Sequence, residues 1–163
     1  MDGSVVALIR PTVAPTMWTS RSDTDGSSWR PLSRAAFPMW ALGHAAVSTK
    51  SGVILVGGRW PSLSVQASWD GGHTWRLFVV DNCDTAQGAM LEVRDNVVLF
   101  AYGAYGPPNT AGPAQLRRQF ISVEHDGLRP LNGAELDAVL DYPSGPGVAR
   151  GPPVVEPALL VHA

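Results

Sequence analysis

The segment Ser68-Trp69-Asp70-Gly71-Gly72-His73-Thr74-Trp75 says more about the fold than any other part of the chain. The Asp70 carboxylate can accept backbone N–H groups inside a turn, and Gly72 tolerates a positive φ. The Ser68 and Thr74 hydroxyls can close the two sides of such a turn, and the Trp75 ring can pack beneath it. The pattern therefore predicts a self-capped turn that joins two strands.

Short apolar segments lie on both sides of this turn and recur along most of the chain. They are rich in β-branched and aromatic residues, as strands are. They cover residues 4–10, 16–22, 43–48, 52–59, 62–69, 74–80, 87–93, 96–103 and 116–124. With 17 glycines and 14 prolines, the composition favours many turns over long helices. We expect an all-β protein, with a single helical candidate at residues 132–140.

The order of strands and turns repeats. Residues 22–29 form a degenerate copy of the turn, with Gly26 and Trp29 in place and its aspartate displaced to Asp25; residues 124–127 are a more eroded third copy. Trp75 follows Trp29 by 46 residues. This spacing is about the length of one four-stranded propeller blade.

The pattern at residues 68–75 resembles the Asp-box (BNR repeat) of the sialidase, or neuraminidase, superfamily of β-propellers. The resemblance implies about three antiparallel blades of a six-bladed ring, with Asp-box turns on one rim. They would occupy residues 1–131, divided near 1–35, 36–80 and 81–131. Met1 falls directly on an Asp-Gly turn. We therefore expect a middle-to-late piece of a propeller, whose first blade lacks its innermost strand.

The resemblance also implies where a ligand would bind. Sialidases hold the substrate carboxylate with three arginines, because guanidinium groups are planar, always charged and bidentate. Arg10 and Arg59 end equivalent strands and are the expected substrate-binding residues. The nucleophilic tyrosine of the family should fall near Gln87, and glutamine cannot serve. The catalytic residues of this chain are therefore unknown, and we expect it to be inactive alone.

Two functions remain open at this point. The first is a fragment of a sialidase-like glycoside hydrolase, whose ancestral exo-α-sialidase activity removes terminal sialic acid or a related acidic sugar. The alternative is a non-catalytic Asp-box module that binds glycans or protein partners. Neither implies a cofactor. The four histidines and Cys83 stand without companions at metal-ligand spacing, so no metal is expected.

The composition limits the classes of partner that this chain is expected to bind. With 12 basic and 14 acidic side chains the formal net charge is −2, which gives no electrostatic drive toward nucleic acid or a membrane surface. No apolar run approaches the roughly 18 residues of a membrane span. The first residues do not form a signal peptide, so the default expectation is a cytoplasmic protein.

The three expected blades would form an open arc and not a closed ring, so the chain has two unprotected ends through which it could associate. Unclosed blades expose strand backbone and apolar faces, so we expect self-association through open propeller edges, or poor stability. Residues 132–163 carry many prolines and predict an irregular tail. A tail that folds back over an open face is the alternative that would leave a monomer.

Overall fold

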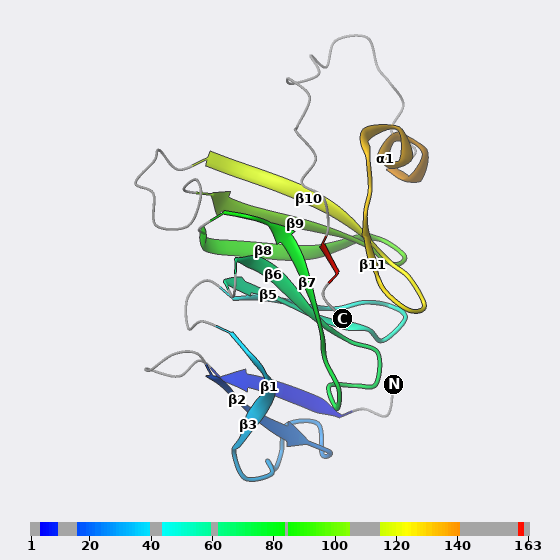
Figure 1. Ribbon diagram of the computed structural model, residues 1–163. Coiled ribbons are helices and arrows are strands. Elements are labelled where there is room, and N and C mark those ends of the chain that lie inside the picture. The colour runs from blue at the N-terminus through cyan, green and yellow to red at the C-terminus, as the bar shows by residue number, and fades with distance from the viewer. Residues whose placement is uncertain are drawn as a thin grey trace.

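The computed structural model describes residues 4–9, 16–39, 44–59, 62–83, 85–104, 115–140 and 160–161. They form three separate antiparallel sheets, in which consecutive strands pair as neighbours (Figure 1). Sheet 1 contains β1 (Val5–Ile9), β2 (Thr16–Ser22) and β3 (Ser33–Pro38). Sheet 2 contains β4 (Ala45–Ser48), β5 (Ile54–Arg59), β6 (Leu63–Ser68) and β7 (Arg76–Asp81), with the short β12 (Leu160–Val161) beside β7. Sheet 3 contains β8 (Thr85–Arg94), β9 (Val97–Ala104), β10 (Gln115–Val123) and β11 (Leu128–Pro130).

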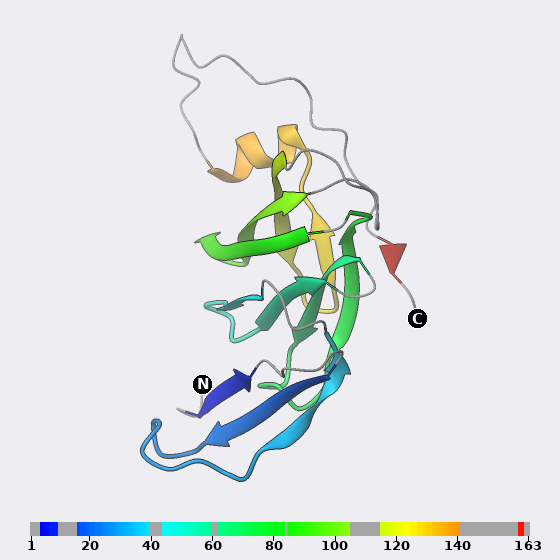
Figure 2. The same ribbon diagram turned by 90° about the vertical axis from the view of Figure 1, so that its left-hand side faces the viewer.

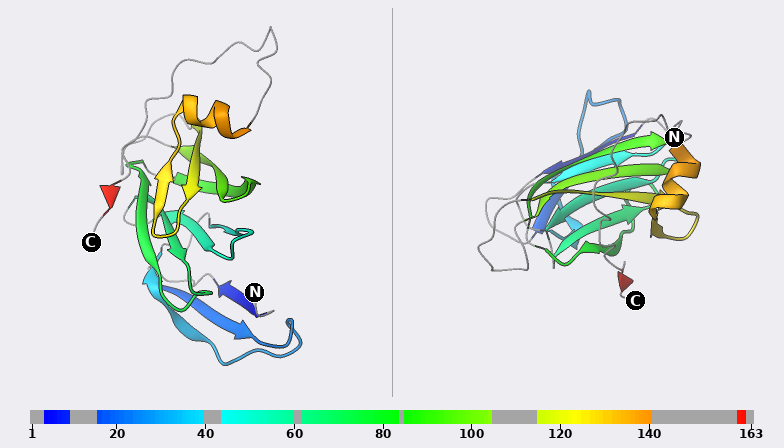
Figure 3. Two further views of the ribbon diagram at one scale, coloured as in Figure 1. Left: turned by 90° about the vertical axis from the view of Figure 1, so that its right-hand side faces the viewer. Right: turned by 90° about the horizontal axis from the view of Figure 1, so that it is seen from above.

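The three sheets stack one above another in chain order, with sheet 2 in the middle (Figure 2). Seen from above, their strands overlie one another (Figure 3). The structure is mostly β, with consecutive antiparallel sheets as predicted; the arrangement of these sheets as propeller blades stays a prediction. The described residues contain no closed sheet, because each strand order ends at an open edge.

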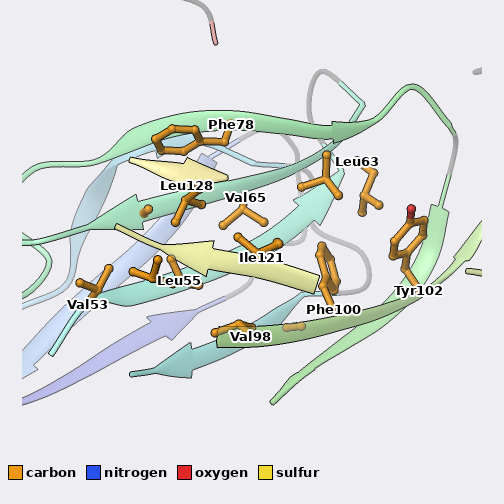
Figure 4. Close-up of a cluster of buried hydrophobic side chains, with 14 of the residues drawn as sticks. Val53, Leu55, Leu63, Val65, Phe78, Val98, Phe100, Tyr102, Ile121 and Leu128 are labelled. Atoms are coloured by element: carbon orange, nitrogen blue, oxygen red, sulfur yellow. The ribbon is translucent and has the colours of Figure 1, made fainter. Parts of the chain in front are cut away.

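Two apolar layers join the sheets. The larger layer lies between sheets 2 and 3, where Leu55, Val65 and Phe78 face Phe100 and Ile121 (Figure 4). All five side chains are almost completely buried. The smaller layer lies between sheets 1 and 2 and contains the buried residues Met17, Phe37, Met39 and Val56. Sheet 2 is therefore covered on both faces, which explains why β6 is buried along its whole length.

Two adjacent glycines in β5 allow this close stacking. A Cβ on Gly57 would lie 2.5 Å from the Met90 Cε, on the side of sheet 3. A Cβ on Gly58 would lie 2.5 Å from the Met39 Sδ, on the side of sheet 1. Successive residues of a strand point to opposite faces, so the Gly-Gly pair removes one side chain from each face of sheet 2.

The helix α1 (Gly133–Leu140) occupies the helical candidate of the sequence. It begins in a capping box: the Asn132 Oδ1 accepts from the Glu135 N–H at 3.0 Å, and a Glu135 carboxylate oxygen accepts from the Asn132 N–H at 3.0 Å. Leu136 and Val139 pack on the face of sheet 3 that points away from sheet 2, against Phe120. Of residues 132–163, the structure describes this helix and β12; the rest of the predicted irregular tail lies outside the described residues.

Candidate functional site

Strand register defines two opposite rims of the stack. The strands β1, β5 and β9 all begin at one rim, because Ser22 pairs with Val5, Ser68 with Ile54 and Ser122 with Val97. This turn rim carries the loops at residues 22–29, 68–75 and 124–127. The opposite rim carries the ends of β5, β7 and β9.

The turn at residues 68–75, the Asp70 turn, is closed by its own side chains. The Asp70 Oδ1 accepts from the backbone N–H groups of His73 at 3.0 Å and Thr74 at 2.9 Å, and Asp70 Oδ2 accepts from the Thr74 hydroxyl at 2.5 Å. The Ser68 hydroxyl donates to Asp70 at 2.8 Å and accepts from the Gly72 N–H at 2.8 Å. Gly72 has a φ of 92°, as the sequence predicted.

Trp75 completes the Asp70 turn. Its Nε1 donates to the Gly72 carbonyl at 3.1 Å, and its ring lies 4.6 Å from the ring of Phe37 in sheet 1. The turn therefore closes a hairpin of sheet 2 and also anchors the neighbouring sheet. This arrangement is structural: all of the oxygens of Asp70 and Ser68 named above serve the turn itself.

The hydrogen bonds change the protonation of Asp70. Desolvation raises the pKa of the Asp70 carboxyl, but the bonds from Thr74, Ser68 and His73 outweigh that effect, and the pKa lies well below its ordinary value. A lowered pKa favours the ionised carboxylate, which is the opposite of what a general acid needs.

The turn at residues 22–29, the Thr24 turn, has the same form with a different acceptor. Here the Thr24 hydroxyl accepts from the Ser28 N–H at 2.9 Å, and the Ser22 hydroxyl accepts from the Gly26 N–H at 2.9 Å. Asp25, which the sequence suggested as the displaced acid, instead lies at the apex with a φ of 50°. The capping position of this turn is thus held by Thr24.

Trp29 also differs from its counterpart Trp75. It is 47% exposed, whereas Trp75 is half-buried against sheet 1. Among the described residues, a neighbouring sheet covers sheet 1 on one side only, so they provide no second sheet against which this ring could pack.

Further bonds on the turn rim connect the sheets. The Arg21 guanidinium donates to the Gly71 carbonyl of the Asp70 turn. On the other side, the Trp69 Nε1 donates to the Glu124 carbonyl of sheet 3 at 2.9 Å. Lys50 and Asp95 join the hairpin turns of sheets 2 and 3 through an exposed ion pair of 2.9 Å. The turn rim thus carries polar contacts that connect each sheet to the next.

The opposite rim contains Arg59, one of the two arginines expected to bind a ligand. Arg59 is the last residue of β5 and is half-buried. It is in register with Leu63, which is in turn in register with Asp81. The backbones of Arg59 and Asp81 are therefore two strands, or about 10 Å, apart. Arg10, the second expected arginine, lies outside the described residues.

The structure adds a cluster at this rim that crosses from sheet 2 to sheet 3. The Asp81 Oδ2 accepts from the Tyr102 hydroxyl at 3.0 Å and from the Arg117 Nη1 at 2.9 Å. Tyr102 is 2% exposed and Asp81 is 8% exposed. The side chain of Arg117 is 37% exposed, so the guanidinium reaches the surface while one nitrogen holds the buried carboxylate.

Tyr102 is unsuited to nucleophilic attack. Burial raises the pKa of its hydroxyl far above the ordinary value, and the nearby negative charge of Asp81 raises it further. A tyrosine nucleophile needs the opposite shift. Gln87, the expected position of the family's nucleophile, lies in β8, where it cannot provide a phenol.

Sequence reasoning missed Asp81 and Arg117. They are 36 residues apart, on strands of different sheets, and no local motif joins them. The ends of the strands were recognisable in the sequence, but the pairing across two sheets depends on how the sheets stack. Cys83, which the sequence also gave no catalytic role, is buried two residues after Asp81.

The described residues show neither a metal-ligand cluster nor a membrane-spanning helix. Within the described ranges, no group of three or more His, Cys, Asp or Glu side chains could hold a metal ion. No helix in the same part of the chain is long and apolar enough to cross a membrane. No family model, curated protein or solved structure matches the chain.

Proposed function

We propose that this chain is a piece of a sialidase-like Asp-box propeller that binds a carboxylate-bearing sugar without cleaving it. The observation that carries the proposal is the position of Arg59. It ends the second strand of a four-stranded meander, on the rim opposite the Asp70 turn. That is where the resemblance to sialidases places a carboxylate-binding arginine.

A second arginine at the same rim supports binding there. Arg117 adds a second guanidinium, and the pKa of this group is raised by its bond to Asp81, so it remains charged. A sugar carboxylate can accept two parallel N–H bonds from one guanidinium, which gives both affinity and orientation. Acidic sugars fit this donor set better than neutral ones.

The same rim argues against cleavage. Glycosidic cleavage with retention needs a nucleophile beside a separate proton donor. Tyr102 is held as a neutral donor to Asp81, and Asp81 already accepts from two groups. The cluster therefore serves to hold the rim in shape, and the alternative of a non-catalytic glycan-binding module is the form of the proposal that the geometry favours.

Titration with N-acetylneuraminic acid, followed by NMR or calorimetry, tests the proposal. Loss of one charge-assisted bond should make Arg59→Gln bind about tenfold more weakly or worse. Arg30→Gln is the matched control, since Arg30 is an exposed arginine on the turn rim. The methyl ester of the sugar, which lacks the negative charge, should bind neither the unaltered chain nor the two variants.

Two results would contradict the proposal. Equal binding by Arg59→Gln, Arg30→Gln and the unaltered chain would remove the site from this rim. Turnover of a fluorogenic sialoside by the purified chain between about pH 5 and 7 would overturn the non-cleaving half of the proposal. Enzymes tune carboxylic acids for proton donation at about that pH.

A further inference from the structure

The strand β1 lacks a neighbour that its counterparts have. In sheet 2, β5 lies between β4 and β6, and in sheet 3, β9 lies between β8 and β10. β1 begins at the same rim and pairs with β2 in the same way, but no described strand lies on its other side. In an antiparallel sheet, alternate residues turn their N–H and C=O groups toward each neighbour. Alternate residues of β1 therefore present these groups to an open edge.

The edge of β1 has none of the features with which proteins usually protect an open strand. Natural edges carry charges, prolines or bulges, or they are very short. The segment Ser4–Ile9 is uncharged, and its register with β2 is unbroken. By contrast, β8 has two irregularities of register, β11 has three residues and β4 has four. Val5 and Ile9 are 37% and 40% exposed.

A groove runs along this open edge. Its volume is about 690 Å³. Most of the exposed wall is apolar and comes from β1 and β4, while Arg21, Asp70 and His73 line the end of the groove at the turn rim. That volume is within the range of about 300–1,000 Å³ that is typical of binding sites. At about 3.4 Å per residue, the five residues of β1 offer some 17 Å of edge, which is the length of a short strand.

The other two sheets indicate what fills such a place. In sheet 2, β4 occupies the equivalent place beside β5, and in sheet 3, β8 occupies it beside β9. Each of these two strands is the last one at that end of its sheet. The occupant is thus a single strand with a free outer edge, and a whole sheet from a second copy does not suit it. The residues of β4, Ala-Ala-Val-Ser, are small and uncharged.

We infer that the groove between β1 and β4 binds one extended, uncharged strand of small and apolar residues from a partner polypeptide, antiparallel to β1. The main-chain bonds would supply the affinity, as in other complexes formed by strand addition. The alternation of side chains would supply the specificity, because every second residue of the strand faces β4. This inference does not depend on the proposed sugar binding, which concerns the opposite rim.

A peptide with the sequence of residues 44–50, His-Ala-Ala-Val-Ser-Thr-Lys, is a suitable probe, since it copies β4 with its flanks. Hydrogen exchange of the full chain reports binding at the amides of Val5–Ile9. With peptide at about ten times its Kd, exchange of the newly bonded amides should slow about tenfold, because opening then requires dissociation. The amides of β11 serve as an internal control and should not change.

Two N-methylated peptides separate strand pairing from apolar adhesion. One carries N-methyl groups on odd residues and the other on even residues, with identical side chains. Since only alternate residues bond to β1, one of these peptides should bind as the parent does and the other should not. Equal binding by both would overturn the inference.

If the free peptide binds too weakly to be detected, a fusion of the peptide to the chain provides a second test. The same seven residues, joined ahead of the chain by a flexible linker, reach an effective concentration on the order of 1 mM. Protection of Val5–Ile9 in the fusion supports the inference, and its absence in both experiments refutes it. Protection that grows with protein concentration in the absence of any peptide would show that a second copy is the occupant, and would also refute it.

Discussion

Thr24 and Asp70 occupy the same place in two turns that are 46 residues apart. Each accepts the backbone N–H of the residue four positions later, Thr24 through a hydroxyl and Asp70 through a carboxylate. The two turns therefore have one geometry but different strengths, because a charged acceptor makes shorter and stronger hydrogen bonds than a neutral one.

Replacing Thr24 with aspartate should strengthen the weaker turn. The new carboxylate would accept from the Ser28 N–H and hydroxyl, as Asp70 does from Thr74, and we expect the free energy of unfolding to rise by about 0.5–1.5 kcal/mol at pH 7. Urea denaturation measures this. Thr24→Asn, which has the same shape without the charge, is the control; equal stability of the two variants would contradict the argument.

Replacing Asp70 with asparagine should weaken the protein in a pH-dependent way. The pKa of Asp70 is lower in the folded than in the unfolded chain, so its contribution is present above the ordinary value of 3.8 and disappears as the pH falls below it. We expect a loss of about 1 kcal/mol at pH 7, since the site is exposed to solvent. The difference between the two proteins should shrink as the pH is lowered toward 3, roughly one unit below that ordinary value.

Asp23→Asn provides the comparison for that experiment. Asp23 is an exposed carboxylate that pairs with Arg30 on the surface, and such pairs contribute little. A loss at pH 7 as large as that of Asp70→Asn would mean that net charge, and not the turn, causes the effect.

Adding a single methyl group at Gly58 should be harmful. A Cβ there would lie 2.5 Å from the Sδ and 2.8 Å from the Cγ of Met39, which is completely buried between sheets 1 and 2. Overpacking of this kind costs about 1–3 kcal/mol. Thermal and urea unfolding of Gly58→Ala measure the cost. Gly133→Ala is the control, because nothing lies within 4 Å of its Cβ, and it should unfold no more easily than the unaltered chain.

Tyr102 should make the protein sensitive to alkali. Burial and the charge of Asp81 raise the pKa of its hydroxyl in the folded state, while the unfolded value is 10.0. Above that pH the unfolded chain loses a proton that the folded chain keeps, so stability should fall as the pH rises. Tyr102→Phe should be less stable at pH 7 by about 1 kcal/mol, for the lost bond, but should lose less on going to alkaline pH. Parallel loss in both proteins would show that Tyr102 is not the cause.

The strands and turns were accessible from sequence because they depend on local chemistry. Local sequence patterns identify the strand Ile54–Arg59 and the turn residues Asp70 and Gly72. Stacking is not local. Nothing in the sequence shows that Gly57 faces Met90 and Gly58 faces Met39, because that depends on which sheet lies on which side.

The candidate site divides in the same way. Arg59 was predicted because it ends a recognisable strand. The cluster of Asp81, Tyr102 and Arg117 was not, because its members come from β7, β9 and β10 and meet only when two sheets stack. The identity of the capping residue Thr24 was missed for a different reason: a nearby aspartate is the more obvious acceptor by residue type, and only the backbone path decides between them.

The position of α1 gives the stack a direction of growth. Leu136 and Val139 cover part of the outer face of sheet 3, so a further repeat on that side would have to displace the helix. At the other end of the stack, no described element packs on the outer face of sheet 1 (Figure 2). Duplicated or designed repeats should therefore be tolerated on the sheet 1 side and rejected on the side of the helix, which makes this a building block that extends one way only.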